Sequence, residues 1–499
     1  MRSRFTVFTV AAVLALATAP SAQQAGALQT AATALGVNNV KTLQFTGAGQ
    51  NFSVGQNYVA SDPWPAVLVK SYTAQINYDT ASMRLELQRE MGPGMPRGGG
   101  APFTGEQRQI QFVGGNFAWN QAAPAANAPA GAAPAMPAPA AGAQLERMLW
   151  LWATPHGFVK AAMANNATTR ANTRGGSDVS FTIGGKHNVT GTINAMGEVE
   201  RVQTMIDHPV VGDMPVVTTY SGYRNFGTVV FPSRIVQTQD GFPSLDLMIW
   251  SATANPAVDL PVPANVQNAP PPAAQNVVST MVAPGVYHLT GGGAHSVAIE
   301  MRDHIVVVDT PTSEARALAV LAKAKEVIAN KPIRFVVTTH HHWDHLSGIR
   351  AAIDEGATIV THESNRALLE RVAKAPHTLV PDRQATSKKS LKIQTVGDRG
   401  QLTDGTRTIE LHREGLNQHT GDYLLVWLPA EKILVEVDIY GPPAMMGQPL
   451  NASAVPFARA LLDTITRLKL DPTNVVPLHG NRTTTVAELR QSAGVTGTN

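Results

Sequence analysis

Residues 339–345 read Thr-His-His-His-Trp-Asp-His, which places metal-binding side chains in the order His-x-His-x-Asp-His. The apolar run 333–339 leading into them predicts a buried strand. Residues 346–355 after them predict a short helix that ends at Gly356. We therefore expect the cluster on a strand-to-helix loop, where so many potential ligands indicate a metal site.

Four side chains of this loop can bind metal. His340 and His342 are two positions apart, so an extended loop can direct both imidazoles to one ion. Asp344 and His345 are adjacent and can diverge toward a second ion. The spacing therefore predicts a site for more than one metal ion.

Four further motifs follow the pattern of a known family. An apolar run ends in Asp309, His419 begins a His-Thr-Gly-Asp motif, a second run ends in Asp438, and a third leads into His479. Their order around the histidine cluster resembles the metallo-β-lactamase superfamily, over roughly residues 275–490. The resemblance implies an α+β fold with a C-terminal αββα sandwich, in which two mixed sheets face each other and helices lie outside.

The resemblance also implies how the ligands divide between two ions. Three histidines would hold the first ion. Two histidines and an aspartate would hold the second, and another aspartate would bridge the pair. In this sequence the first set is His340, His342 and His419, the second is Asp344, His345 and His479, and the bridge is Asp438.

Nitrogen and oxygen ligands in a chain without cysteine suit zinc and also tolerate iron or manganese. We expect two zinc ions per chain, which lower the pKa of a shared water so that hydroxide forms near neutral pH. The resemblance implies hydrolysis of an ester, lactone, thioester or amide, with His340, His342 and Asp344 as catalytic ligands. Asp344 is also expected to orient the nucleophile.

Ligating imidazoles need a partner for the nitrogen that does not bind metal. Asp309 matches the superfamily position that provides one near the histidine cluster, so we predict support rather than ligation. Thr420 is predicted to support His419 in the same way.

Length and composition indicate a two-domain globular protein. The chain has 499 residues, of which 43% are hydrophobic. This length exceeds what a single hydrophobic core usually supports, so we expect two domains. A formal net charge of +3 makes no electrostatic case for nucleic acid, so we expect a small-molecule substrate. The absence of cysteine excludes disulfides, thiolate ligands and cysteine nucleophiles.

Residues 1–22 predict a secretory signal peptide. Arg2 and Arg4 precede the apolar run 5–17, which is too short for a comfortable membrane span, and small residues follow at 19–22. We expect a periplasmic or secreted protein with no stable membrane span after cleavage. The alternative is that the run anchors the chain in a membrane.

The first half of the chain has a different pattern. Residues 27–260 contain runs of alternating polar and apolar positions, which predict an antiparallel β-rich domain. Residues 91–101 and 121–143 are rich in Gly, Pro and Ala and are predicted to be loops that do not pack. The Pro-rich residues 261–274 predict a linker to the metal-binding domain, residues 275–499.

The substrate class depends on loop residues near the predicted site. Asp438 stands where superfamily β-lactamases carry cysteine or serine. An aspartate there resembles type II glyoxalases, lactonases and tRNA-processing nucleases instead, and the low net charge and the predicted export signal disfavour RNA processing. The pairs Pro442-Pro443 and Met445-Met446 predict an apolar lip and favour a hydrophobic acyl or lactone substrate. Two alternatives stay open: a mononuclear iron oxidoreductase or dioxygenase on the same fold, and a periplasmic binding protein whose metal domain is accessory.

Overall fold

The structure is a computed structural model that describes residues 22–92, 97–123, 135–443, 445 and 448–495. The predicted signal peptide lies outside the described residues except for Ala22, which begins helix α1 (Ala22–Leu35). Within these ranges, no helix has both the length and the apolar character needed to cross a membrane.

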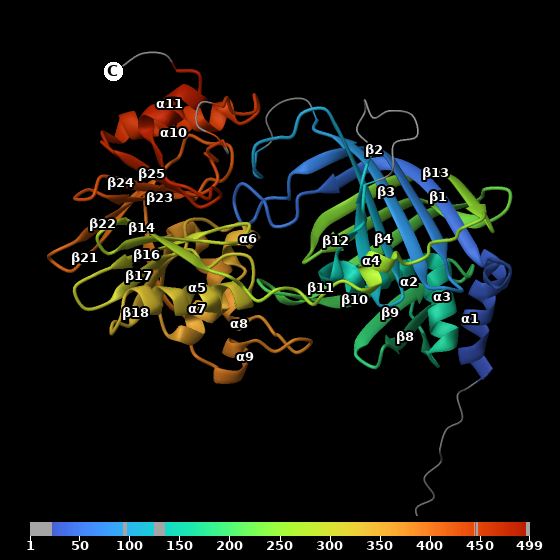
Figure 1. Ribbon diagram of the computed structural model, residues 1–499. Coiled ribbons are helices and arrows are strands. Elements are labelled where there is room, and N and C mark those ends of the chain that lie inside the picture. The colour runs from blue at the N-terminus through green and yellow to red at the C-terminus, as the bar shows by residue number, and fades with distance from the viewer. Residues whose placement is uncertain (1–21, 93–96, 124–134, 444, 446–447, 496–499) are drawn as a thin grey trace, which may run out of the picture.

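The first half of the chain forms one antiparallel sheet that curves around short helices (Figure 1), as the alternating runs predict. The strand order is β6-β5-β4-β3-β2-β1-β13-β12-β11-β10-β9-β8-β7, so the two ends of this chain segment, β1 and β13, pair in the middle. The strands are β1 (Thr42–Phe52), β2 (Ala66–Asn77), β3 (Ser82–Glu90), β4 (Glu106–Gly114), β5 (Phe117–Ala122), β6 (Ala138–Pro139), β7 (Thr168–Ala171), β8 (Ser177–Ile183), β9 (His187–Ile193), β10 (Val199–His208), β11 (Gly212–Asn225), β12 (Val230–Gln239) and β13 (Phe242–Ala254).

Helices α2 (Gln144–Ala153) and α3 (Pro155–Ala164) pack against this sheet. Pro155 occupies the first position of α3, where its missing N–H has no helical partner to lose. Leu151 and Phe158 share one buried core with Phe45 of β1. The helices therefore close the apolar side of the curved sheet.

The second half of the chain forms two sheets that face each other, in agreement with the predicted sandwich (Figure 1). Both are mixed, because parallel pairs such as β18·β19 and β24·β25 occur beside antiparallel ones. The first sheet runs in order through β14 (Val278–Ala283), β15 (Val286–Thr290), β16 (Ser296–Glu300), β17 (Ile305–Val308), β18 (Ile333–Val337), β19 (Thr358–His362) and β20 (Lys392–Val396). The second runs through β21 (Arg399–Thr403), β22 (Thr408–Arg413), β23 (Leu424–Leu428), β24 (Ile433–Glu436), β25 (Asn474–Pro477) and β26 (Thr484–Thr485).

Helices cover the outer faces of the sandwich and one of these faces also meets the first half of the chain. Side chains of the first sheet and its helices share a buried cluster with Trp64 of the β1–β2 loop and with Ile206 and Met214 of the N-terminal sheet. The two halves are therefore joined by a continuous hydrophobic core. The helices are α5 (Glu314–Val327), α6 (Trp343–Leu346), α7 (Ile349–Glu355), α8 (Arg366–Lys374), α9 (Arg383–Ser387), α10 (Val455–Leu468) and α11 (Val486–Ser492).

The prediction that residues 91–101 and 121–143 do not pack is wrong for their described parts. Strand β6 and the 3-10 turn Ala141–Ala143 lie within the second segment, whose residues 124–134 fall outside the described ranges. In the first segment, the Gly98 and Gly99 N–H groups donate to carbonyl oxygens of other loops. Small residues bury little side-chain area, but their backbone groups still pair. The predicted linker likewise contains a short helix, α4 (Ala264–Gln267).

His156 of α3 makes the stability of this core depend on pH. The side chain is buried, Nε2–H donates to Leu35 O at 3.0 Å, and Nδ1 has no partner among the described residues. Burial lowers the pKa of His156 to about 4. As pH falls, the imidazole of the unfolded chain takes up a proton before that of the folded chain does. The contribution of the neutral, buried His156 to stability is therefore complete above the unfolded pKa of 6.5 and is lost as pH falls toward 4.

We expect His156→Gln, whose amide can still donate to Leu35 O, to make unfolding less sensitive to acid. The single histidine accounts for about 2 kcal/mol of lost stability between pH 7 and pH 5. Urea unfolding of both proteins at the two pH values measures the difference, and groups common to both cancel. An equal loss in wild type and variant would contradict the assignment.

Candidate metal centre

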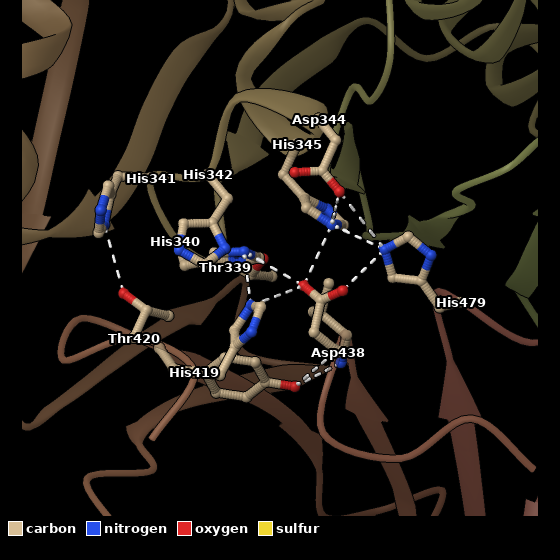
Figure 2. Close-up of polar contacts among 12 residues, drawn as sticks. Thr339, His340, His341, His342, Asp344, His345, His419, Thr420, Asp438 and His479 are labelled. Carbon is tan, nitrogen blue, oxygen red and sulfur yellow. Dashed lines mark hydrogen bonds and ion pairs between the residues drawn. The ribbon is translucent and has the colours of Figure 1, made fainter. Parts of the chain in front are cut away.

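The candidate site forms where strands of both sheets end (Figure 2). Asp309 follows β17, and the histidine cluster follows β18 and leads into α6. Asp438 and His479 follow the parallel strands β24 and β25. His419 lies in the connection between β22 and β23. Because these ends meet at one edge of the sandwich, side chains from distant parts of the sequence face one another.

The seven predicted ligands separate into two groups. In each group the candidate ligand atoms lie within 4.8 Å of one another. The first group is His340, His342 and His419, and the second is Asp344, His345, Asp438 and His479.

Asp438 lies between the groups, where a bridging ligand is predicted. Its Oδ2 is 3.2 Å from His340 Nε2 and 3.1 Å from His419 Nε2 of the first group. The same oxygen is 3.2 Å from His345 Nε2, and Oδ1 is 2.7 Å from His479 Nε2. One carboxylate therefore reaches imidazoles of both groups.

Each of the five imidazoles directs one nitrogen into the site and holds the other against an oxygen acceptor. Four of these acceptors are carbonyl or carboxylate oxygens, so the histidine nitrogen must donate its N–H. The fifth is the Thr339 hydroxyl, which donates its own proton to Asp309 and so accepts from His340. The pairs are His340 Nδ1 with Thr339 Oγ1 (3.2 Å), His342 Nε2 with Asn57 O (2.9 Å), His345 Nδ1 with Asp309 Oδ2 (3.0 Å), His419 Nδ1 with Gly99 O (2.7 Å) and His479 Nδ1 with Gly293 O (3.1 Å).

In the neutral form of each imidazole, these contacts leave the lone pair on the inward nitrogen, so the lone pairs would face one another. His345 Nε2 and His479 Nε2 are 3.1 Å apart, and His340 Nε2 and His419 Nε2 are 3.2 Å apart. The buried His342 Nδ1 has no hydrogen-bond partner among the described residues. Converging imidazole nitrogens around one carboxylate fit a cation, so the residues present suit a pair of divalent metal ions.

Sequence comparison identifies the family to which the metal-binding region is similar. Residues 289–434 match the metallo-beta-lactamase superfamily. The C-terminal region belongs to that superfamily. A 57-residue stretch is 39% identical to the linear primary-alkylsulfatase of Pseudomonas sp. (strain ATCC 19151), and this stretch spans 11% of each of the two chains.

Solved metallo-β-lactamases align with part of this chain. One is the metallo-β-lactamase from Pontibacter korlensis, with a TM-score of 0.34 and 21% identity over 44% of this chain and 98% of that one. Another is FIM-1 from Pseudomonas aeruginosa in its mono-zinc form, with a TM-score of 0.34 and 20% identity over 44% of this chain and 94% of that one.

Burial and neighbouring charges shift the pKa values of the histidines in the metallo-β-lactamase region. Burial and repulsion from neighbouring imidazoles lower the pKa of His340 and of His342 well below the ordinary value. Burial also disfavours charge on His345, but Asp438 and Asp344 raise its pKa well above that value. Protons and a cation thus compete for the inward nitrogen of His345, and acid should weaken metal binding.

Asp309 lies outside both ligand groups, in the supporting position that the sequence predicts. Its backbone adopts φ +57°, which is uncommon for a residue other than glycine. The buried carboxylate accepts hydrogen bonds from Thr339 N–H (2.9 Å), Thr339 Oγ1–H (2.8 Å) and His345 Nδ1–H (3.0 Å). These contacts hold the His345 imidazole directly and the His340 imidazole through Thr339.

Thr420 does not support His419 as predicted. Its hydroxyl contacts Tyr58 O at 3.1 Å, His341 Nδ1 at 3.3 Å and the Asp422 carboxylate. Figure 2 shows His341 turned away from the ligands toward Thr420. The hydroxyl therefore belongs to a buried network behind the site, and Gly99 O takes the supporting role at His419.

Several groups at the site were missed by sequence reasoning. Asn57 and Gly99 hold two ligating histidines, and the Gln56 amide donates to Asp344 Oδ1 at 2.7 Å. All three come from the N-terminal half, where no local pattern marks them. Glu436 ends an apolar strand beneath Asp438, and burial together with repulsion from Asp438 raises its pKa well above the ordinary value.

Proposed function

We propose that this chain is a dinuclear zinc-dependent hydrolase that cleaves an ester, lactone, thioester or amide with an apolar chain. The observation that carries the proposal is the set of five imidazoles whose lone pairs converge around Asp438. These residues would hold divalent ions, which would supply Lewis acidity and lower the pKa of a bound water toward neutral pH.

Asp344 is proposed to orient the attacking nucleophile through a hydrogen bond. With 38% of its side chain exposed, it is the most accessible of the ion-paired groups at the site. Burial disfavours its charged form, but His345 holds the pKa of Asp344 well below its usual range, so the carboxylate is ionised near neutral pH. Gln56 binds Oδ1, while Oδ2 lies 3.4 Å from His345 Nε2 and 3.7 Å from His479 Nε2.

A cavity of 320 Å³ beside Asp438 supports an apolar substrate. Its described lining contains no basic residue that would bind a substrate carboxylate or phosphate. Of the predicted apolar lip, Pro443 is part of this lining, Pro442 and Met445 are not, and Met446 lies outside the described residues. The apolar lining side chains are Ala101, Ile439, Pro443, Pro449, Leu450, Ala454 and Phe457.

A sulfate ester is the second candidate substrate. The segment that is 39% identical to a linear primary-alkylsulfatase favours it, and an alkyl sulfate also carries an apolar chain. The same cavity would bind the chain, and the reaction would again be attack by water on an electrophilic ester centre.

We expect the protein, purified without chelators, to contain about two zinc ions per chain. Elemental analysis measures this, followed by assays on nitrophenyl acyl esters of increasing chain length, acyl lactones, thioesters, anilides and a linear alkyl sulfate. Turnover should rise with chain length. A single iron with oxygen consumption would instead favour the oxidoreductase, and ligand uptake without turnover would favour the binding protein.

We also propose that the chain is exported to the periplasm or secreted. The support is the positively charged start at Arg2 and Arg4 followed by the apolar run 5–17. Mass spectrometry of the protein recovered from each cell fraction tests this. A periplasmic or secreted form that begins near residue 23 is expected, and an intact N-terminus in the membrane fraction would support the anchor.

A further inference from the structure

Two loops of the N-terminal half lie directly on the metal centre. The first, residues 53–65, connects β1 and β2, and the second contains residues 97–99 between β3 and β4. They are tied together because Gly99 N–H donates to Gln56 O at 2.8 Å. Gly98 N–H donates to Gln418 O at 2.7 Å, next to the ligand His419. Arg97 lies over the Tyr58 ring, 4.0 Å from its centroid.

We propose that these two loops are a built-in part of the metal centre: they hold His342 and His419 in the metal-binding tautomer, and Gln56 is a positioning residue for Asp344. The loops lie outside residues 289–434, so the superfamily match assigns them no role. The inference rests on the proposed metal site, and it gives the β-rich N-terminal half a function in metal binding.

The tautomer argument concerns two of the three ligands in the first group. His342 Nε2–H donates to Asn57 O and His419 Nδ1–H donates to Gly99 O. A carbonyl oxygen only accepts, so each contact fixes the proton on the outer nitrogen and leaves the lone pair facing inward. Both imidazoles are buried, so a displaced loop would leave an N–H group without a partner, which is unfavourable.

Gln56 acts on the second ligand group. A carboxylate accepts hydrogen bonds and does not donate them, so the 2.7 Å contact with Asp344 Oδ1 requires the amide NH2 of Gln56. The amide adds no charge, and it leaves Asp344 Oδ2 facing His345 and His479. Such supporting contacts typically affect metal affinity by about 10–100-fold.

Packing around Trp343 fixes the first loop in place. Gly55 has φ +73°, and a Cβ there would lie 2.4–2.7 Å from atoms of the Trp343 side chain. Trp343 N–H donates to Gly55 O at 3.2 Å, and the Trp343 ring packs edge-on against Trp64 of the same loop. The loop is therefore clamped against the helix that carries Asp344 and His345.

The first test compares Gln56→Leu with Gln75→Leu. Gln75 is a matched control because its amide also bonds a side chain, Gln44 Oε1 at 2.9 Å, but within the sheet. We expect Gln56→Leu to weaken binding of one zinc ion about 10–100-fold, measured by competition with a chromophoric chelator, while the other ion and the control stay as in wild type.

The second test compares Gly55→Ala with Gly105→Ala. Both glycines have nearly the same backbone conformation, φ +73° and +71°, but a Cβ at Gly105 meets nothing within 4 Å. The strain of a left-handed alanine is therefore common to both, and only Gly55→Ala displaces the loop. We expect weaker binding of the ion at the first group and an altered visible spectrum of the cobalt-substituted protein.

Metal readouts separate this inference from the proposed function. Wild-type affinities and spectra in folded Gln56→Leu and Gly55→Ala, judged by circular dichroism, would overturn the inference even if the protein hydrolyses esters. Two tightly bound ions in wild type, weakened in both variants, would support it even if none of the tested substrates turns over. If Gly55→Ala does not fold, Gln56→Leu alone decides.

Discussion

His342→Ala and Asp344→Ala are each expected to lower kcat/KM by about 10³-fold or more without unfolding the chain. Each variant removes one ligand, from the first and the second group respectively. Metal ions contribute several kcal/mol of transition-state stabilisation, and about 1.4 kcal/mol corresponds to a tenfold change in rate. Steady-state kinetics on the best substrate of the panel, with metal content measured in parallel, checks the expectation.

The matched control for the first of these variants is His187→Ala. His187 begins β9 in the N-terminal sheet and is no member of either ligand group. The same chemical change there should leave kcat/KM and metal content at the wild-type values. Full activity in either ligand variant, with a native circular dichroism spectrum, would refute the dinuclear assignment.

Trp343→Ala is expected to give the largest loss of stability, about 3–5 kcal/mol in the free energy of unfolding. The side chain is only 8% exposed and lies between two predicted ligands in sequence. Its ring centroid is 5.3 Å from that of Trp64 and 4.3 Å from that of His208, both from the N-terminal half. Truncation therefore opens a cavity at the junction of the two halves.

Urea unfolding followed by circular dichroism measures this loss, with Trp250→Ala as the control. Trp250 lies on β13 and is 50% exposed, so its truncation should change the free energy of unfolding by about 0.5 kcal/mol or less. If Trp343→Ala cost as little as the control, the shared hydrophobic cluster would not hold the two halves together.

The sandwich and the ligand groups were predictable because each motif carries local information. Buried runs before Asp309, His340, Asp438 and His479 identify strands, and the polar residue after each run marks the strand end. In parallel strands these ends meet at one edge of a sheet, so the residues converge whatever the loops do. The structure brings all seven predicted ligands together, and His419 reaches the site from the connection between the antiparallel strands β22 and β23.

The supporting contacts were not predictable in the same way. Gln56 and Asp344 are 288 residues apart, and the carbonyl of Gly99 is 320 residues from His419. A backbone carbonyl has no sequence signature, and the Gly/Pro-rich composition of residues 91–101 favours an unpacked loop. The prediction for Thr420 is wrong because the direction of its hydroxyl depends on Tyr58 and Asp422.

The sequence by itself determined the chemistry of this protein: which side chains can bind metal, on which strand ends they lie, and that no thiolate takes part. Those properties are local, since they depend on residue type and on periodicity within a few positions. Only the tertiary structure decided which nitrogen of each imidazole faces the site and that the N-terminal sheet supplies the acceptors for His342 and His419. Hydrogen bonds between distant segments set these features, and they form only once the shared core has packed the two halves against each other.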